Sequence, residues 1–424
     1  MASRIAIVGT GISGLVCAHR LHPEHDITLF EAQDRVGGHT NTVRVDAADG
    51  AHWVDTGFIV FNDRNYPNFE PLLAVLGVAT QKSQMSFSVS DGTGGFEYSG
   101  SPRGLFAQPG NAANPRFLRM VADLVRFNRE VRGLLELAPD EGPSLREFLD
   151  EGGYGDWFTE RLIVAQASAV WSADPEQMWS FPAAFLARFF HNHGMLGFTG
   201  RPQWRTVTGG SRRYVEEITR PFAHRIRAGA PVRSIERTPD GVLVRAEGHE
   251  TELFDEVVVA AHADQALAML DRPSAAERDV LGAVAYQPNQ AVLHTDTSVM
   301  PRRRAAWASW NAHLVSGARD ARLTYWMNEL QRLDTKTDYL VSLNMADRID
   351  PAKVVETIDY SHPVFTPEGV AAQGRQMEIS GADRIHYCGA YWRWGFHEDG
   401  VVSALRALDR VGGAALPARR AVAA

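Results

Sequence analysis

The chain has 424 residues, of which 45% are hydrophobic and 22% charged, and its formal net charge is −8 at pH 7. This composition is typical of a folded protein long enough for two domains, and it argues against extensive disorder. The negative charge argues against a general nucleic-acid binder, which usually presents a basic domain or stripe. Most positive charge is arginine, because the lysines are only Lys82, Lys336 and Lys353.

The cysteine pattern and the absence of targeting signals set the expected compartment. Cys17 and Cys388 form neither a disulfide framework nor a Cys/His metal motif. We expect both to be buried, small apolar side chains in a reducing environment. The sequence shows no signal-peptide pattern and no apolar run of about 18 residues or more. It therefore predicts a cytoplasmic protein without a membrane span or a metal site, and it predicts no particular oligomeric state.

The first motif is an apolar run, Ile5–Val8, followed by G-x-G-x-x-G and a helical pattern. Gly9 permits a tight turn, Gly11 lets a pyrophosphate approach the backbone, and Gly14 lets helix and strand pack closely. The helix N-terminus then offers free N–H groups to the anion. A second apolar run ends in Glu31, at the spacing at which an acid binds a ribose hydroxyl. These features predict a dinucleotide-binding strand–turn–helix unit.

Two further motifs follow this unit, Arg35-Val36-Gly37-Gly38-His39-Thr40 and Val54-Asp55-Thr56-Gly57-Phe58-Ile59-Val60. With them, the sequence resembles the flavin-binding superfamily of amine oxidases, protoporphyrinogen oxidase and phytoene desaturases. The resemblance implies FAD as the cofactor, with the double glycine and the basic residue after it continuing the pyrophosphate site. It also implies an α/β fold, in which a Rossmann-like, three-layer FAD-binding domain with a parallel sheet carries an inserted α+β substrate domain.

The C-terminal segment resembles the other half of such a site. Residues 385–390 are typical of a last strand that ends in a glycine turn, and residues 395–405 of a loop that enters a helix. In the superfamily this helix directs its N-terminus at the flavin pyrimidine ring, where its dipole stabilises negative charge. The resemblance implies the following cofactor-binding residues: Gly9, Gly11, Ile12, Ser13, Gly14, Glu31, Ala32, Arg35, Gly37, Gly38, His39, Thr40, Gly57, Phe58, Ile59, Val60, Val232, Ala260, Ala261, Gly389, Ala390, Gly400 and Val401.

We therefore predict a discontinuous FAD-binding domain interrupted by a substrate domain, with no internal repeat. The FAD-binding domain comprises 1–80, 205–283 and 350–415, the substrate domain comprises 81–204 and 284–349, and 416–424 is a tail.

The expected elements follow from periodicity and turn residues. In chain order they are a helix over 67–76, a hairpin over 84–98, a helix over about 115–135, a helix over 214–222, and strands at 230–235, 242–244, 257–261, 291–294 and 340–343. The helix over 115–135 is amphipathic and carries several arginines. It is either a solvated surface helix or a membrane-facing surface that collects a lipid.

His397 and Glu398 are the candidate catalytic residues. A histidine titrates near neutrality and acts as a general acid or base, and a neighbouring carboxylate is a suitable partner. The alternative is structural: both residues cap the last helix and bond flavin oxygens, with Asp399 as the N-cap.

Phe396, Trp204 and Trp326 are the candidate substrate contacts. By position Phe396 matches one of the two aromatic residues that frame the amine in amine oxidases, and no residue clearly matches the other. Those enzymes commonly carry a lysine near the flavin in the segment that corresponds to Gly282–Val292, which contains none here. The residues thus favour an apolar substrate channel over an amine site.

Three histidines bear on the expected pH dependence and on metal binding. His39 stands where the superfamily commonly has arginine, so we expect the affinity for FAD to fall as pH rises through neutrality. His191 and His193 lack a third ligand at metal-binding spacing, which favours packing, hydrogen bonding or substrate contact.

Coverage of the resemblance is nearly end to end, and the nearest branch is often associated with modified fatty-acid synthesis. Its features here are the segments 38–42, 55–62, 201–207 and 395–400. The sequence has a single G-x-G-x-x-G, so a second nucleotide site for NAD(P)H is not expected. We predict an FAD-dependent oxidoreductase that oxidises or desaturates a small hydrophobic substrate, a fatty acyl chain. A monoamine oxidase, a redox-neutral fatty-acid double-bond isomerase and a non-enzymatic flavin-binding protein are the alternatives.

Overall fold

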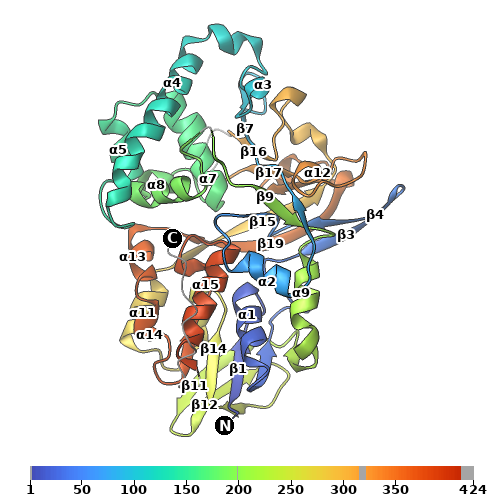
Figure 1. Ribbon diagram of the computed structural model, residues 1–424, viewed down its shortest axis with the longest axis vertical. Helices are drawn as coiled ribbons and strands as arrows, with labels where there is room; N and C mark the ends of the chain where they lie inside the picture. Colours follow the sequence, from blue (N-terminus) through green and yellow to red (C-terminus); the bar gives the residue numbers. More distant parts are fainter. Residues whose placement is uncertain (1, 198, 315–320, 412–424) are drawn as a thin grey trace.

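The computed structural model describes residues 2–197, 199–314 and 321–411. It has two parts, a parallel sheet with its helices and a second sheet with a group of helices (Figure 1). The predicted tail, 416–424, lies outside the described residues.

The first part is built on a five-stranded sheet in which every neighbouring pair is parallel. Its order is β10 (Ile226–Arg227), β2 (Asp26–Phe30), β1 (Arg4–Val8), β14 (Glu256–Val259) and β20 (Ile385–Tyr387). The first and the last of these strands in the chain thus belong to one sheet. Their nearly continuous apolar sequences reflect burial on both faces.

Two layers cover the parallel sheet, which confirms the three-layer α/β prediction. Helices α1 (Ile12–Leu21), α9 (Arg212–Thr219) and α15 (His397–Leu408) cover one face, and the antiparallel strands β11 (Val232–Thr238), β12 (Gly241–Ala246) and β13 (Glu252–Phe254) cover the other. Alternation along β1 explains this, because successive side chains point to opposite faces. Ile5 and Ile7 pack with the helices, and Ala6 and Val8 pack with the antiparallel strands.

The second part contains a seven-stranded, mostly antiparallel sheet. Its order is β19 (Val354–Val364), β15 (Ala285–His294), β18 (Leu340–Leu343), β17 (Leu323–Trp326), β16 (Trp310–His313), β7 (Phe87–Ser90) and β8 (Glu97–Ser99). The predicted hairpin is β7 with β8. Residues 350–415 were expected wholly in the FAD-binding domain, but β19 pairs with the whole length of β15 and so lies in this sheet. The boundary of that segment moves to the C-terminal end of β19.

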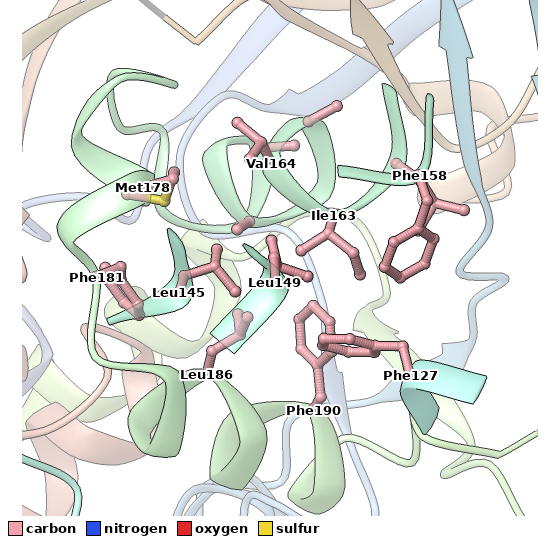
Figure 2. Close-up of a cluster of buried hydrophobic side chains, with 14 of the residues drawn as sticks. Phe127, Leu145, Leu149, Phe158, Ile163, Val164, Met178, Phe181, Leu186 and Phe190 are labelled. Atoms are coloured by element: carbon pink, nitrogen blue, oxygen red, sulfur yellow. The ribbon is translucent and has the colours of Figure 1, made fainter. Parts of the chain in front are cut away.

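A group of helices packs on this sheet around an aromatic core. They are α3 (Pro102–Leu105), α4 (Pro115–Glu130), α5 (Leu145–Glu151), α6 (Asp156–Phe158), α7 (Ala165–Trp171) and α8 (Ala183–Asn192), with a π-helical turn, Thr159–Val164, between α6 and α7. Figure 2 shows Phe127, Leu149, Phe158 and Phe190 converging between them. Burial of each phenylalanine contributes about 2 kcal/mol relative to an exposed ring.

Helix α4 has the predicted amphipathic form. Asn114 caps it, and its apolar side packs in the core while Arg119 and Arg126 pair with Asp123. Ion pairing of this kind accounts for part of the arginine pattern, and contact of α4 with a membrane stays a prediction. No helix in the described part of the chain is long and apolar enough to cross a bilayer.

The remaining elements pack around these two sheets. They are β3 (Thr42–Ala47), β4 (Gly50–Asp55), β5 (Phe61–Asn62), α2 (Phe69–Val75), β6 (Thr80–Lys82), β9 (Trp204–Val207), α10 (Ala263–Met269), α11 (Ala275–Gly282), α12 (Met327–Leu330), α13 (Pro367–Gln373) and α14 (Gln376–Ile379). Strands β5, β9 and β6 form a small sheet. Cys17 and Cys388 are buried as expected, with their sulfur atoms 3.9 Å apart and no disulfide.

Candidate active site

A cavity of about 1590 Å³ joins the two parts of the molecule. It begins at the C-terminal ends of β1, β2 and β14, and extends to aromatic side chains from α7, α8 and the loop before α15. The carboxyl ends of parallel strands are the usual binding edge of such a sheet. Residues from both ends of the chain therefore line one cavity.

The glycine turn after β1 is fixed by close backbone contacts. Gly9 has φ +99°, and a Cβ at Gly14 would lie 2.0 Å from the Gly9 carbonyl oxygen. A side chain at Gly14 would push α1 away from the turn. A Cβ at Gly11, by contrast, would have no protein atom within 4 Å among the described residues, and Gly11 lines the cavity. The turn is thus tightly packed at Gly9 and Gly14 and open to the cavity at Gly11.

Glu31 joins the glycine turn to the double-glycine motif. Its carboxylate accepts hydrogen bonds from the backbone N–H groups of Thr10, at 3.0 Å, and Gln33, at 2.9 Å. The Thr10 hydroxyl donates to the same carboxylate and accepts from the N–H of Gly37. Glu31 also lines the cavity, so it holds the turn in place and keeps lone pairs free for a ribose hydroxyl.

The residues at this end fit FAD. Gly11 is the N-cap of α1 and provides no side-chain cap, so the first N–H groups of the helix are available to an anion. The Nε2 atom of His39 is buried without a hydrogen-bond partner in the described structure, although its ring lines the cavity. A phosphate or a ribityl hydroxyl would supply that partner. When bound, FAD supplies the two-electron acceptor for the substrate.

Most of the predicted cofactor-binding residues line this cavity. They are Gly9, Gly11, Ile12, Ser13, Glu31, Ala32, Arg35, Gly38, His39, Gly57, Phe58, Ile59, Val60, Val232, Ala260, Ala261, Gly389 and Ala390. The others lie just behind the wall, and they are Gly14, Gly37, Thr40, Gly400 and Val401. Gly400 shows why: its Cβ would lie 2.7 Å from Ile12 Cγ2, so it lets α15 approach α1.

His397 lies in the cavity wall at the N-terminus of α15. Its Nε2 lies 3.0 Å from the Thr40 hydroxyl and 2.9 Å from that of Tyr214, and its ring stacks on Phe58. The Thr40 and Tyr214 hydroxyls also contact each other, so the two hydroxyls and Nε2 form one buried hydrogen-bonded group. Burial, and then the nearby His39, keep the pKa of His397 well below its ordinary value. His397 is therefore a neutral hydrogen-bonding group near pH 7.

Glu398 does not lie beside His397 in the cavity, which corrects the expected acid–base pair. Its carboxylate accepts from the N–H groups of Asn68, at 3.1 Å, and Phe69, at 2.9 Å, at the start of α2. Consecutive residues of a helix point in different directions, so a cavity-facing His397 turns Glu398 away. Asp399 is not the N-cap either: Phe396 holds that place, and Asp399 accepts from its N–H at 2.9 Å.

A group of rings around His39 was not foreseen from the sequence. The centroid of His39 lies 5.8 Å from that of His262, 5.4 Å from that of His362 and 5.0 Å from that of Tyr360. His262 directly follows the predicted strand run that ends at Ala261. Its place at the carboxyl end of a strand could have indicated from the sequence that it lies at the cavity. His362 and Tyr360 come from β19, whose place beside the cavity depends on its pairing with β15.

The position of His39 corrects the expected pH range for FAD binding. Burial, together with the nearby His262 and Arg35, lowers the pKa of His39 to about 4. His39 is thus already uncharged near pH 7, so a rise of pH through neutrality removes no positive charge from the FAD site. The same burial lowers the pKa of His262 to about 4 and that of His362 to about 3.

We therefore expect the affinity for FAD to be nearly constant from pH 7 to pH 8, on the order of a twofold change at most, and to rise only in acid, as the pH falls toward the pKa of about 4 of His39. A bound anion raises the pKa of His39 above its value in the free protein, so FAD takes up protons on binding in acid and affinity increases as pH falls. Titrating apoprotein with FAD, followed by flavin fluorescence, measures this. A change of about tenfold or more between pH 7 and pH 8 would contradict it.

The far end of the cavity is an aromatic chamber. We define it as Val170, Trp171, Phe189, His193, Trp204, Trp310, Tyr325, Phe365, Trp394 and Phe396, all of which line the cavity. Their rings are in contact: Phe189 lies 4.8 Å from Trp171 and 5.4 Å from Phe396 between centroids. Two of the predicted substrate contacts, Trp204 and Phe396, thus belong to the chamber.

Trp326, the third predicted substrate contact, lies outside the cavity. Its Nε1 donates to Asp338 at 2.8 Å, and its ring packs against Trp307. Adjacent residues of a strand point to opposite faces, so Tyr325 faces the chamber and Trp326 cannot. On the neighbouring strand β16, Trp310 faces the chamber instead.

The charge of the chamber is low. No carboxylate of the described residues belongs to it: the carboxylates that line the cavity are Glu31, which directly follows β2, and the exposed Glu356 and Asp359, on β19. Of the arginines nearby, the exposed Arg201 lines the cavity, and the guanidinium of Arg393 lies over the Trp394 ring, 4.0 Å from its centroid. Strand β15, which carries Pro288 in the cavity wall, contains no lysine. The chamber therefore suits an apolar, uncharged part of a substrate. The described residues also contain no cluster that could hold a metal.

Comparison with known proteins agrees with this geometry. Residues 12–303 match the family model described as flavin containing amine oxidoreductase. A Mycobacterium tuberculosis protein named as a flavin-containing monoamine oxidase, AofH, is 25% identical over 333 residues, which are 74% of this chain and 67% of the relative. The sequence expectation of an FAD-dependent enzyme is thereby confirmed.

Solved structures share the fold. A cyclohexylamine oxidase from Brevibacterium oxydans superposes with a TM-score of 0.69 at 16% identity, covering 96% of this chain and 98% of that one. A fatty acid isomerase from P. acnes superposes with a TM-score of 0.67 at 15% identity, covering 97% and 99%. The family match spans most of the chain, and the protein belongs to the flavin-containing amine oxidoreductase family as an FAD-dependent oxidoreductase.

Proposed function

We propose that this enzyme oxidises or desaturates a hydrophobic substrate, a fatty acyl chain, by transferring a hydride to FAD. The observation that carries the proposal is the aromatic chamber, which opens from the same cavity as the glycine turn. Apolar walls bind an acyl chain by removing it from water, at about 0.8 kcal/mol for each buried CH₂ group. His397, neutral and held by Thr40 and Tyr214, would hydrogen-bond the cofactor at the chamber entrance.

The chamber offers an ammonium group aromatic faces but, among the described residues, no carboxylate. A cationic amine is stabilised by carboxylates or by aromatic faces arranged around it, and burial of an unpaired charge is costly. The chamber has no carboxylate among the described residues, and β15 has no lysine at the flavin side. Phe396 offers a ring without a hydroxyl. These features support a lipid over an amine, although the relative from Mycobacterium tuberculosis is named for monoamines.

Anaerobic mixing of the FAD-loaded protein with a panel of fatty acids, acyl esters and amines tests the proposal. We expect loss of the oxidised flavin absorbance with a lipid and no change with the amines. Loss of absorbance with an amine alone would contradict the proposal and establish a monoamine oxidase. Conversion of a lipid to a double-bond isomer, with no net flavin reduction and no oxygen consumed, would instead establish an isomerase.

A further inference from the structure

The aromatic chamber contains one histidine, His193, whose ring is buried but lines the cavity. It follows α8 as its C-cap and is 6% exposed. The ring stacks on Phe189 with centroids 3.9 Å apart, and it lies nearly parallel to Trp204. The imidazole is therefore held in one plane between aromatic neighbours, with an edge toward the chamber.

The hydrogen bond of His193 fixes which nitrogen carries the proton. Nδ1 lies 2.9 Å from the carbonyl oxygen of Phe189. A carbonyl oxygen only accepts, so Nδ1 is the donor and carries the hydrogen. Burial, with Arg393 and Arg64 nearby, lowers the pKa of His193 to about 4, so the ring is neutral near pH 7. Nε2 is then an unprotonated acceptor.

No hydrogen bond to Nε2 comes from any residue that the structure describes, and this nitrogen is not among the fully enclosed, unpartnered atoms. It is thus an acceptor in the chamber wall that a molecule inside the chamber can reach. Of the other polar groups there, Tyr325 lies against Ser172, the Gln166 amide both donates and accepts, and the Trp310 indole N–H, which is also unpartnered in the described structure, only donates. When a ligand displaces water from the chamber, this acceptor costs free energy unless the ligand itself supplies a donor.

We propose that Nε2 of His193 accepts a hydrogen bond from the substrate, so that the chamber selects hydrophobic molecules that carry a hydroxyl or N–H group. This inference rests on the proposed function and narrows its substrate class to acyl chains or related lipids with a donor group. A site built to hydrogen-bond a substrate group rejects the analogue that lacks it, because the protein atom is then buried unpaired. Apolar walls alone discriminate much less between such analogues.

Two probes that differ in the donor test the inference on the FAD-loaded protein: decanol, which donates, and decyl methyl ether, which only accepts. Quenching of tryptophan fluorescence reports binding, because Trp171, Trp204 and Trp394 line the chamber. We expect decanol to bind about tenfold or more tightly than the ether. In His193→Phe, which keeps an aromatic ring and removes the acceptor, the ratio of the two affinities should fall to about one.

Two further variants keep the test decisive. His193→Gln offers an amide N–H for the Phe189 carbonyl and an oxygen for the ligand, so it should retain a preference for decanol even if the phenylalanine variant does not fold. His191→Phe makes the same change at an exposed neighbour and should leave the ratio unchanged. Equal affinities in the unaltered protein would overturn the inference and leave the proposed function standing. Failure of both probes to bind would overturn both.

Discussion

Replacing Gly11 with valine is expected to leave the protein folded and to weaken FAD binding by about a hundredfold or more, equivalent to about 3 kcal/mol. A Cβ at Gly11 meets no protein atom within 4 Å among the described residues, and its φ of −63° suits any residue. The branched side chain would instead fill the cavity in front of the first N–H groups of α1. Equilibrium dialysis with FAD and thermal unfolding of the apoprotein measure the two effects.

Two glycines serve as controls for this variant. Gly133→Val introduces the same side chain outside the cavity, at a position where a Cβ meets no atom of another described segment within 4 Å, so both FAD binding and stability should be preserved. Gly14→Val places a Cβ 2.0 Å from the Gly9 carbonyl oxygen and should destabilise the apoprotein itself, by about 3 kcal/mol or more. A Gly11→Val protein that retains one tightly bound FAD would contradict the cofactor assignment at this turn.

Glu398→Ala is expected to destabilise the protein by about 3 kcal/mol and to leave the chemistry of bound flavin unchanged. The carboxylate accepts three hydrogen bonds at the start of α2, from the N–H groups of Asn68 and Phe69 and from the Asn68 amide at 2.5 Å. Its removal leaves these donors buried without a partner and removes a negative charge from a helix N-terminus. Urea unfolding measures the stability change.

The rate of flavin reduction per bound FAD separates this structural role from a catalytic one. Because Glu398 points away from the cavity, we expect that rate to change by less than about twofold. Glu151→Ala removes an exposed glutamate at the end of α5 and should change neither quantity. A hundredfold slower reduction with unchanged stability would restore Glu398 as a catalytic residue.

The parts of the site that the sequence predicted are those built from local spacing. Gly9, Gly11, Gly14 and Glu31 act within one strand–turn–helix–strand unit, so their order in the chain fixes their relation in space. The end of β20 and the start of α15 were recognisable for the same reason. Apolar periodicity likewise predicted the hairpin of β7 and β8 and the amphipathic helix α4, because both depend on neighbours in the sequence.

What the sequence could not predict depends on contacts between distant segments. Glu398 bonds residues 330 positions away, and nothing near it in the chain indicates that partner. The choice of Trp310 over Trp326 depends on which face of the seven-stranded sheet forms the cavity wall. The low pKa of His39 follows from burial beside His262, the N-cap of α10, and rings of β19, which only the assembled fold brings together.

The flavin content of the purified protein tests the central claim most directly, since both ends of this chain are said to form one FAD site. Acid release of the bound flavin, followed by its identification and quantitation against protein, should give one FAD for each chain. Apoprotein should regain that ratio when it is supplied with FAD. A protein that emerges without flavin and takes up none from solution would contradict the account.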